Sequence, residues 1–212
     1  MDRPMTERVC LAVLGDSFVA GIGDREHRGW VGRLAATVND GLYPVVCYAL
    51  GVGGETTADI LVRAERELAP RLQADTRNGV IISTGVNDTD WEDRGPRLRP
   101  AASGDALQRL LSTAERYGPA LLVGPPPVTD EDHNARIAAL ADAFRTACTA
   151  RHVGFVDTYR PLRGDATWMT QVAATDGAHP DSAGYSVMTH VIQASQAWRR
   201  FCTGLGLRLP VL

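Results

Sequence analysis

Short apolar runs alternate along the chain with segments of helical periodicity. Five runs have the length and the β-branched content of strands: Val9–Leu14, Val45–Leu50, Val80–Ser83, Ala120–Val123 and Phe155–Val156. Their apolar residues are continuous and do not alternate with polar ones, which is typical of strands buried on both faces of a parallel sheet.

The segments between these runs place apolar side chains three or four positions apart, as amphipathic helices do. This spacing predicts helices over Trp30–Val38, Ala58–Leu68, Asp105–Tyr117, Ile137–Arg151 and Ala183–Phe201, and a short helix over Thr167–Val172. Asp181 and Ser182 are suitable N-caps for the closing helix. The alternation predicts one α/β domain over residues 1–212, a three-layer α/β/α sandwich around a five-stranded parallel sheet.

One segment interrupts this alternation. Residues Thr89–Asp105 are charged, contain Pro and Gly, and are long for a connection between a strand and a helix. Two interpretations stay open at this point: a loop at the rim of a functional site, or a surface insertion without a role.

The composition excludes several classes of function. The 22 basic residues, all Arg, face 25 acidic residues, for a net charge of -3, so nothing favours nucleic-acid binding. The absence of Lys excludes Schiff-base catalysis. No apolar run approaches the ~20 residues of a membrane span, and the N-terminus lacks the apolar stretch of a secretory signal.

The cysteines indicate the redox environment. Four cysteines (Cys10, Cys47, Cys148 and Cys202) lie far apart and match no spacing of a metal or redox motif. Cys10 and Cys47 fall in strand-like runs, so we interpret them as small buried thiols. We therefore expect a reducing, cytoplasmic location.

Polar residues and glycines follow each of the first four predicted strands, and a further polar loop precedes the last helix. These segments read GDS (15–17), GVGGETT (51–57), STGVND (83–88), GPPPV (124–128) and ATDGAHPDSAGY (174–185). In open parallel sheets, ligands bind beyond the carboxyl ends of the strands. The chemistry of this chain is therefore expected at that edge.

Three residues of these segments suit nucleophilic catalysis. Serine acts as a nucleophile at neutral pH when a histidine takes its proton and a carboxylate orients the histidine. Asp176 and His179 lie three residues apart in one loop, so the carboxylate can reach Nδ1 while Nε2 faces Ser17. The other histidines are weaker candidates, because His27 lies in a polar stretch after the first strand, His133 and His152 flank a predicted helix, and His190 lies inside the last helix.

Acyl transfer also requires donors for the oxyanion that develops on the carbonyl. The amide of Ser17, at a turn that opens a helix, supplies one donor. The amide of Gly54, in a glycine-rich loop, and the side-chain amide of Asn87 supply two more. Each motif alone is weak evidence, and Asn-Asp pairs are also common in turns. Their place at the ends of successive strands makes them a candidate oxyanion hole.

Taken together, these segments resemble the four sequence blocks of the SGNH hydrolases, the GDSL esterases and lipases. The matching residues are Gly15-Asp16-Ser17, Gly54, Gly85-x-Asn87-Asp88 and Asp176-x-x-His179-Pro180, in the family's order. The resemblance implies a flavodoxin-like fold, Ser17 as nucleophile, His179 as base and then acid, and Asp176 as the orienting carboxylate. It also implies the oxyanion donors Ser17, Gly54 and Asn87.

Two departures from the family pattern are small. Phe18 follows the serine where Leu is usual, and a shift in loop register would make Gly53 the donor in place of Gly54. The chain has no G-x-S-x-G elbow, which argues against the α/β-hydrolase fold.

The expected reaction is cleavage of a small ester or thioester through an acyl-enzyme on Ser17, without a cofactor or metal. We expect Asp16, Pro127 and Trp168 to contact the substrate. Acyl transfer to an alcohol would use the same triad, and the sequence does not separate it from hydrolysis. Two weaker alternatives are a metal-dependent phosphoesterase with ligands from Asp16, Asn87, Asp88 and His179, and an anion-binding module without catalysis.

Overall fold

The computed structural model describes residues 8–38 and 45–209. Its main sheet has five parallel strands in the order β2-β1-β3-β6-β7. They are β1 (Val9–Gly15), β2 (Val45–Gly51), β3 (Arg77–Ser83), β6 (Ala120–Val123) and β7 (Gly154–Val156). Every predicted apolar run forms a strand, which confirms the five-stranded parallel sheet. Counted along this sheet, the order is 2-1-3-4-5, that of the flavodoxin-like doubly wound fold.

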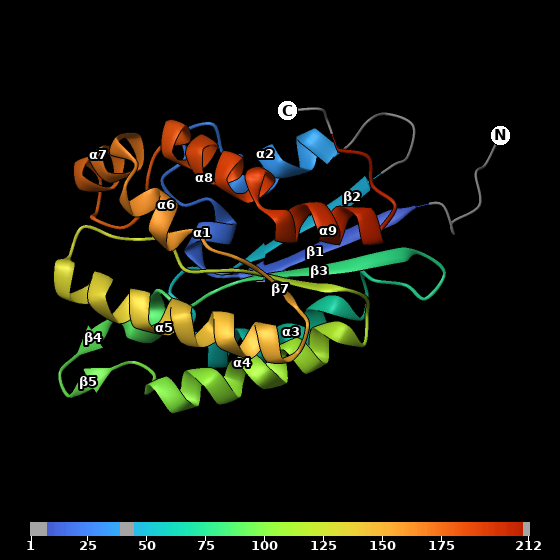
Figure 1. Cartoon of the computed structure of the whole chain (residues 1–212), viewed down its shortest axis with the longest axis horizontal. Helices are drawn as coiled ribbons and strands as arrows, with labels where there is room; N and C mark the ends of the chain where they lie inside the picture. Colours follow the sequence, from blue (N-terminus) through green and yellow to red (C-terminus); the bar gives the residue numbers. More distant parts are fainter. Residues whose placement is uncertain (1–7, 39–44, 210–212) are drawn as a thin grey trace.

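Helices cover both faces of the sheet (Figure 1). One face carries α2 (Gly29–Val38), α8 (Ser182–Ala194) and α9 (Gln196–Gly204), and the other carries α3 (Thr57–Leu68), α4 (Pro100–Glu115) and α5 (Glu131–Ala150). The short helices are α1 (Ser17–Ala20), α6 (Tyr159–Arg163) and α7 (Ala166–Ala174). The predicted three-layer α/β/α arrangement is therefore confirmed.

The interior position of β1, between β2 and β3, explains why its sequence shows no alternation of apolar and polar residues. Val9, Leu11 and Val13 pack into the core beneath α2, α8 and α9. Cys10, Ala12 and Leu14 pack into the core beneath α3, α4 and α5. Because each face is covered by helices, both sets of side chains are buried, as the continuous apolar run predicts.

Three helices differ clearly from the predicted boundaries: α4, which starts at Pro100 rather than Asp105, the closing helix, and α5. The single closing helix Ala183–Phe201 is wrong, because Ser195 ends α8 and caps α9, its side chain accepting a hydrogen bond from the Trp198 amide. The helix predicted from Ile137 begins earlier, at Glu131, since Asp130 caps it by accepting from the His133 amide.

The segment Thr89–Asp105, predicted as a loop, contains a short hairpin and the first turns of a helix. A 3-10 turn, η2 (Asn87–Thr89), leads into a small antiparallel hairpin of β4 (Trp91–Glu92) and β5 (Gly95–Pro96). Helix α4 then starts at Pro100, because proline at the first helical position has no amide hydrogen that needs an acceptor. The hairpin is tied to η2, since the Leu98 amide donates to the Asp88 carbonyl at 2.9 Å.

All four cysteines are free thiols. Cys10 is buried as predicted, whereas Cys47 is only half-buried. Burial raises the pKa of Cys47 to about 11 and that of Cys148 and Cys202 to about 12. These thiols are therefore protonated and unreactive at neutral pH.

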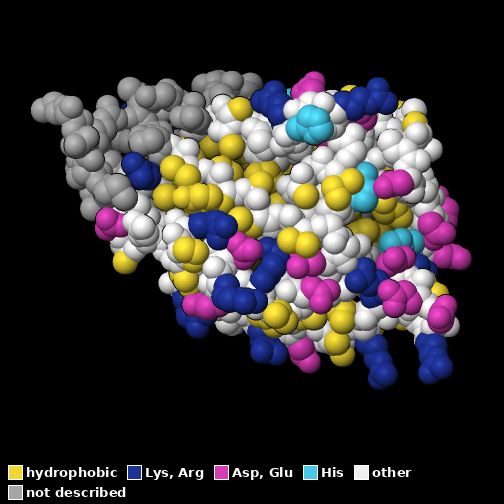
Figure 2. Space-filling view, turned by 180° about the vertical axis from the view of Figure 1, so that it is seen from behind, with side chains coloured by type: hydrophobic (Ala, Val, Ile, Leu, Met, Phe, Trp, Pro, Cys, Tyr) yellow, Lys and Arg dark blue, Asp and Glu magenta, His cyan; other side chains and the backbone are white. Residues whose placement is uncertain are grey.

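The surface carries charges of both signs. On the face shown in Figure 2, arginine and acidic side chains are interspersed. Among the helices of the described residues, none is long and apolar enough to cross a membrane.

Candidate active site

Ser17 lies where β1 ends and α1 begins, at the carboxyl edge of the sheet. The turn is tight, since a Cβ on Gly15 would lie 2.3 Å from the Ser83 carbonyl oxygen. Asp16 caps α1 by accepting a hydrogen bond from the Phe18 amide at 3.0 Å. The first amides of a helix have no acceptor within the helix, so the Ser17 amide is available to an incoming oxyanion.

The structure brings Ser17, His179 and Asp176 into one hydrogen-bonded line. The distance between Ser17 Oγ and His179 Nε2 is 2.7 Å, and that between His179 Nδ1 and Asp176 Oδ2 is 2.6 Å. The serine and the histidine come from segments 162 residues apart. This is the geometry that a histidine needs to accept the serine proton while a carboxylate fixes its tautomer.

Asp176 is held as a carboxylate. Its Oδ1 accepts hydrogen bonds from the amides of Ala178 at 3.0 Å and His179 at 2.9 Å, in a turn where Gly177 has φ 88°. Burial alone would raise the pKa of Asp176, but the hydrogen bonds from His179 and Ala178 outweigh it and lower the pKa to about 2. A negative charge next to Nδ1 would favour an imidazolium if His179 accepted the Ser17 proton.

The other two proposed oxyanion donors lie on neighbouring strand ends. Gly54 has φ 78° and open space where a Cβ would be, so a substrate can approach its backbone. Gly53, the alternative donor, is exposed in the same loop. Asn87 donates from its side-chain amide to the Glu55 carbonyl at 2.9 Å and, over a longer 3.5 Å, to Asp16 Oδ2, so an oxyanion would take the place of the weaker of these two acceptors.

A match to a family model decides the classification. The model of the GDSL-like lipase/acylhydrolase family matches residues 13–187. The chain belongs to this family. The resemblance inferred from the four sequence blocks is thereby confirmed, and this GDSL-like acylhydrolase has the family's α/β fold.

Solved structures share this fold at low sequence identity. A lipase/acylhydrolase from Enterococcus faecalis is 22% identical, with a TM-score of 0.74 over 96% of this chain and 99% of that one. A member of the lipolytic G-D-S-L family from Veillonella parvula is 16% identical, with a TM-score of 0.71 over 86% and 95%. A catalytic mutant of the acetylxylan esterase Axe2 from Geobacillus stearothermophilus is 16% identical, with a TM-score of 0.70 over the full length of both chains. A search of curated proteins found no match.

The expected substrate contacts of the GDSL-like acylhydrolase are buried. Trp168 has no exposed surface, and its indole Nε1 donates to the Pro127 carbonyl at 3.0 Å, where Pro127 is itself buried. Ser17 is itself only 5% exposed, so burial does not decide whether the two residues contact a substrate, and this stays a prediction. Trp168 stacks on Phe18 at 6.4 Å between ring centroids, and Phe18 contacts the His179 ring at 4.9 Å. Phe18, the departure from the family pattern, supports the histidine.

Asp16, the third expected contact, is only 1% exposed, and its contact with a substrate likewise stays a prediction. Burial, with smaller contributions from the charges of Asp88 and Glu55, raises its pKa to about 7. Its Oδ2 lies 3.5 Å from Asn87 Nδ2. Asp16 therefore acts beneath the site, on the turn that presents Ser17.

Sequence reasoning missed a tether between the serine and histidine segments. Asp24 follows α1 and accepts a hydrogen bond from Ser182 Oγ at 2.6 Å, three residues beyond His179. Burial would raise the pKa of Asp24, but hydrogen bonds from Arg33 and Ser182 hold it well below its usual range. Tyr185 adds a second link, donating to the Ile22 carbonyl at 2.7 Å. No sequence motif marks these residues, since their partners are remote in the chain.

The remaining histidines of the acylhydrolase do not join the triad. His133, for example, lies with Nε2 3.1 Å from the Val86 carbonyl and 3.1 Å from Thr89 Oγ1. Within residues 8–38 and 45–209, no group of three or more His, Cys, Asp or Glu side chains could hold a metal ion.

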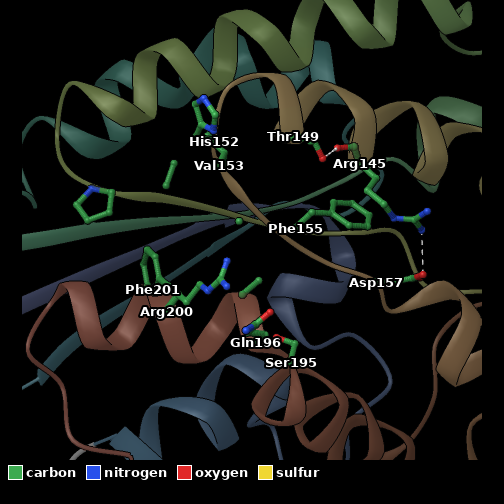
Figure 3. A pocket seen from close by; sticks show the side chains of 14 residues that line it. Arg145, Thr149, His152, Val153, Phe155, Asp157, Ser195, Gln196, Arg200 and Phe201 are labelled. Atoms are coloured by element: carbon green, nitrogen blue, oxygen red, sulfur yellow. Dashed lines mark hydrogen bonds and ion pairs between the residues drawn. The ribbon is translucent and has the colours of Figure 1, made fainter.

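A groove of about 690 Å³ lies between α5, β7 and α9 (Figure 3). Its lining includes His152, Phe155 and Arg200, and Arg145 forms an ion pair with Asp157 at 2.9 Å on its wall. None of the proposed catalytic or oxyanion residues lines this groove. The groove is therefore separate from the candidate active site, despite its volume.

Proposed function

We propose that this chain hydrolyses carboxylic esters through an acyl-enzyme on Ser17. The observation that carries the proposal is the pair of short contacts, 2.7 Å and 2.6 Å, that join Ser17, His179 and Asp176 in series. Membership of the acylhydrolase family supports it. Structural relatives named as a lipase/acylhydrolase and an acetylxylan esterase agree with ester substrates.

The first half of the reaction forms the acyl-enzyme. Ser17 Oγ attacks the ester carbonyl carbon while His179 Nε2 takes the hydroxyl proton, and Asp176 stabilises the resulting imidazolium. The carbonyl oxygen becomes an oxyanion that accepts hydrogen bonds from the amides of Ser17 and Gly54 and from Asn87 Nδ2. His179 then gives its proton to the alcohol as the bond from the carbonyl carbon to the alkoxy oxygen breaks.

The second half releases the acid. A water molecule gives a proton to His179 Nε2 and attacks the acyl carbon, and the same three donors hold the second oxyanion. Collapse of this intermediate breaks the bond to Ser17 Oγ, which recovers its proton from His179. An alcohol in the place of water would yield a new ester from the same acyl-enzyme.

The test compares Ser17→Ala with the wild-type chain on p-nitrophenyl acetate and butyrate. Ser112→Ala is the matched control, because Ser112 lies on α4 and bonds the Gln108 carbonyl and Arg151 rather than the site. We expect Ser17→Ala to lose hydrolysis and labelling by a fluorophosphonate, whereas Ser112→Ala keeps both. Wild-type turnover by folded Ser17→Ala would overturn the proposal.

A further inference from the structure

Arg63, on α3, joins the ends of two strands beneath the candidate oxyanion hole. Its guanidinium side chain is only 13% exposed. One nitrogen, Nη2, donates to the Gly15 carbonyl at 2.8 Å and to the Leu50 carbonyl at 2.9 Å. Gly15 ends β1 immediately before the turn of Ser17, and Leu50 lies at the end of β2, before the loop of Gly54. A single side chain therefore connects the segments that present two of the proposed donors.

The same guanidinium reaches the third donor through Glu55. Arg63 Nε donates to Glu55 Oε2 at 2.6 Å, and the backbone carbonyl of Glu55 accepts from Asn87 Nδ2 at 2.9 Å. The Glu55 side chain is only 18% exposed, so water screens this ion pair less than it would a surface pair. The orientation of the Asn87 amide thus depends on a residue that Arg63 holds in place.

The loop that carries Gly54 needs such support. Val52, Gly53 and Gly54 are all exposed, and glycine gives the backbone wide conformational freedom. The outer side of the loop is held by Arg97, which donates from Nη1 to the Gly54 carbonyl at 2.8 Å. Arg63 holds the inner side, against the sheet.

We propose that Arg63 is a positioning residue that sets the geometry of the oxyanion hole by anchoring Glu55 and the ends of β1 and β2. The inference rests on the proposed function. A guanidinium bonds in several fixed directions at once, whereas an ammonium is a compact point charge. A catalytic group displaced by about 1 Å can cost roughly 100-fold in rate, so loss of Arg63 acts on kcat and leaves substrate binding nearly unchanged.

The experiment measures kcat and KM on p-nitrophenyl acetate for Arg63→Met, Arg63→Lys, Glu55→Gln and the double variant Arg63→Met/Glu55→Gln. Active sites are counted by endpoint labelling with a fluorophosphonate, and kcat is calculated per labelled site, so that unfolded protein is not counted as enzyme. The matched control is Arg66→Met, because Arg66 lies on the same helix, is exposed and has no hydrogen bond or ion pair to any described residue. Inhibition by phenylboronic acid, whose tetrahedral adduct with serine imitates the oxyanion intermediate, reports on the hole itself.

We expect Arg63→Met to lower kcat by roughly 10- to 100-fold, with KM within about two-fold of the wild-type value. Inhibition by phenylboronic acid should weaken by a factor similar to that for kcat. Arg63→Lys recovers part of the loss, and the double variant is no worse than Arg63→Met because the two residues act in series. Arg66→Met behaves as wild type. A lower thermal stability of Arg63→Met with unchanged kcat per labelled site would show a purely structural role and overturn the inference, while the proposed function would stand. Absence of hydrolysis by the wild-type chain would overturn both.

Discussion

A substitution of Trp168 tests how much this buried side chain contributes to the stability of the packing around the candidate site. The change is Trp168→Phe, which keeps an aromatic ring beside Phe18 but removes the indole nitrogen that donates to the Pro127 carbonyl at 3.0 Å. Trp168 is 0% exposed, so neither the lost atoms nor the freed carbonyl is replaced by solvent without rearrangement.

Two contributions set the magnitude. A buried carbonyl left without its donor costs about 1–3 kcal/mol. The smaller ring leaves a cavity of roughly 40 Å³, which at about 24 cal/mol per Å³ adds about 1 kcal/mol. The free energy of unfolding should therefore fall by about 2–4 kcal/mol, which for a chain of this size lowers Tm by roughly 4–16 °C.

The assay combines thermal unfolding followed by circular dichroism with ester hydrolysis at 25 °C, where the variant remains folded. Activity should fall by less than about ten-fold, since Phe18 still contacts His179 at 4.9 Å between ring centroids. Trp91→Phe is the control, because Trp91 is 59% exposed and its replacement should change stability by no more than about 0.5 kcal/mol. A Tm for Trp168→Phe equal to that of wild type would refute this account of the site.

Three further predictions concern the chemistry. Asn87→Ala should lower kcat by about 100- to 1000-fold, and steady-state kinetics showing a change only in KM would contradict its role as an oxyanion donor. Asp176→Asn should lower kcat by about 10⁴-fold, because the amide no longer stabilises imidazolium, and retention of wild-type kcat would exclude the proposed triad. Asp16 has a folded pKa raised from 3.8 to about 7, so its contribution to stability is fully present below pH 3.8 and is lost as pH rises through 7, at roughly 1.4 kcal/mol per unit. Urea unfolding from pH 4.5 to 7.5 should show a growing advantage of Asp16→Asn over wild type, and parallel curves would show that Asp16 is not protonated by burial.

The sheet and the line of hydrogen bonds through Ser17, His179 and Asp176 were predictable from sequence because both depend on local signals. Continuous apolar runs such as Val80–Ser83 identify buried parallel strands without knowledge of their neighbours. Ser17, Asp176 and His179 follow from motifs at strand ends, since the carboxyl ends of parallel strands meet at one edge.

The supporting residues were not predictable, because their roles depend on contacts across the chain. In the sequence, Arg63 has the position of a solvent-exposed charge on an amphipathic helix. In the structure it donates to the Gly15 carbonyl, 48 positions away. The stacking of the fully buried Trp168 on Phe18 was not predictable either, because burial is a property of the packed core rather than of residue type. The break at Ser195 was hidden, since the apolar periodicity continues through it and only the capping of Trp198 reveals it.

The distance in sequence between Ser17 and His179 has a consequence for biosynthesis. Ser17 directly follows the first strand of the sheet, but its proposed base His179 and the tether residue Ser182 come from the last quarter of the chain. A nascent chain therefore displays the nucleophile before the residue that activates it has left the ribosome. In the proposed mechanism, Ser17 is therefore not activated until the segment that carries His179 and α8 has packed against the turn of Ser17.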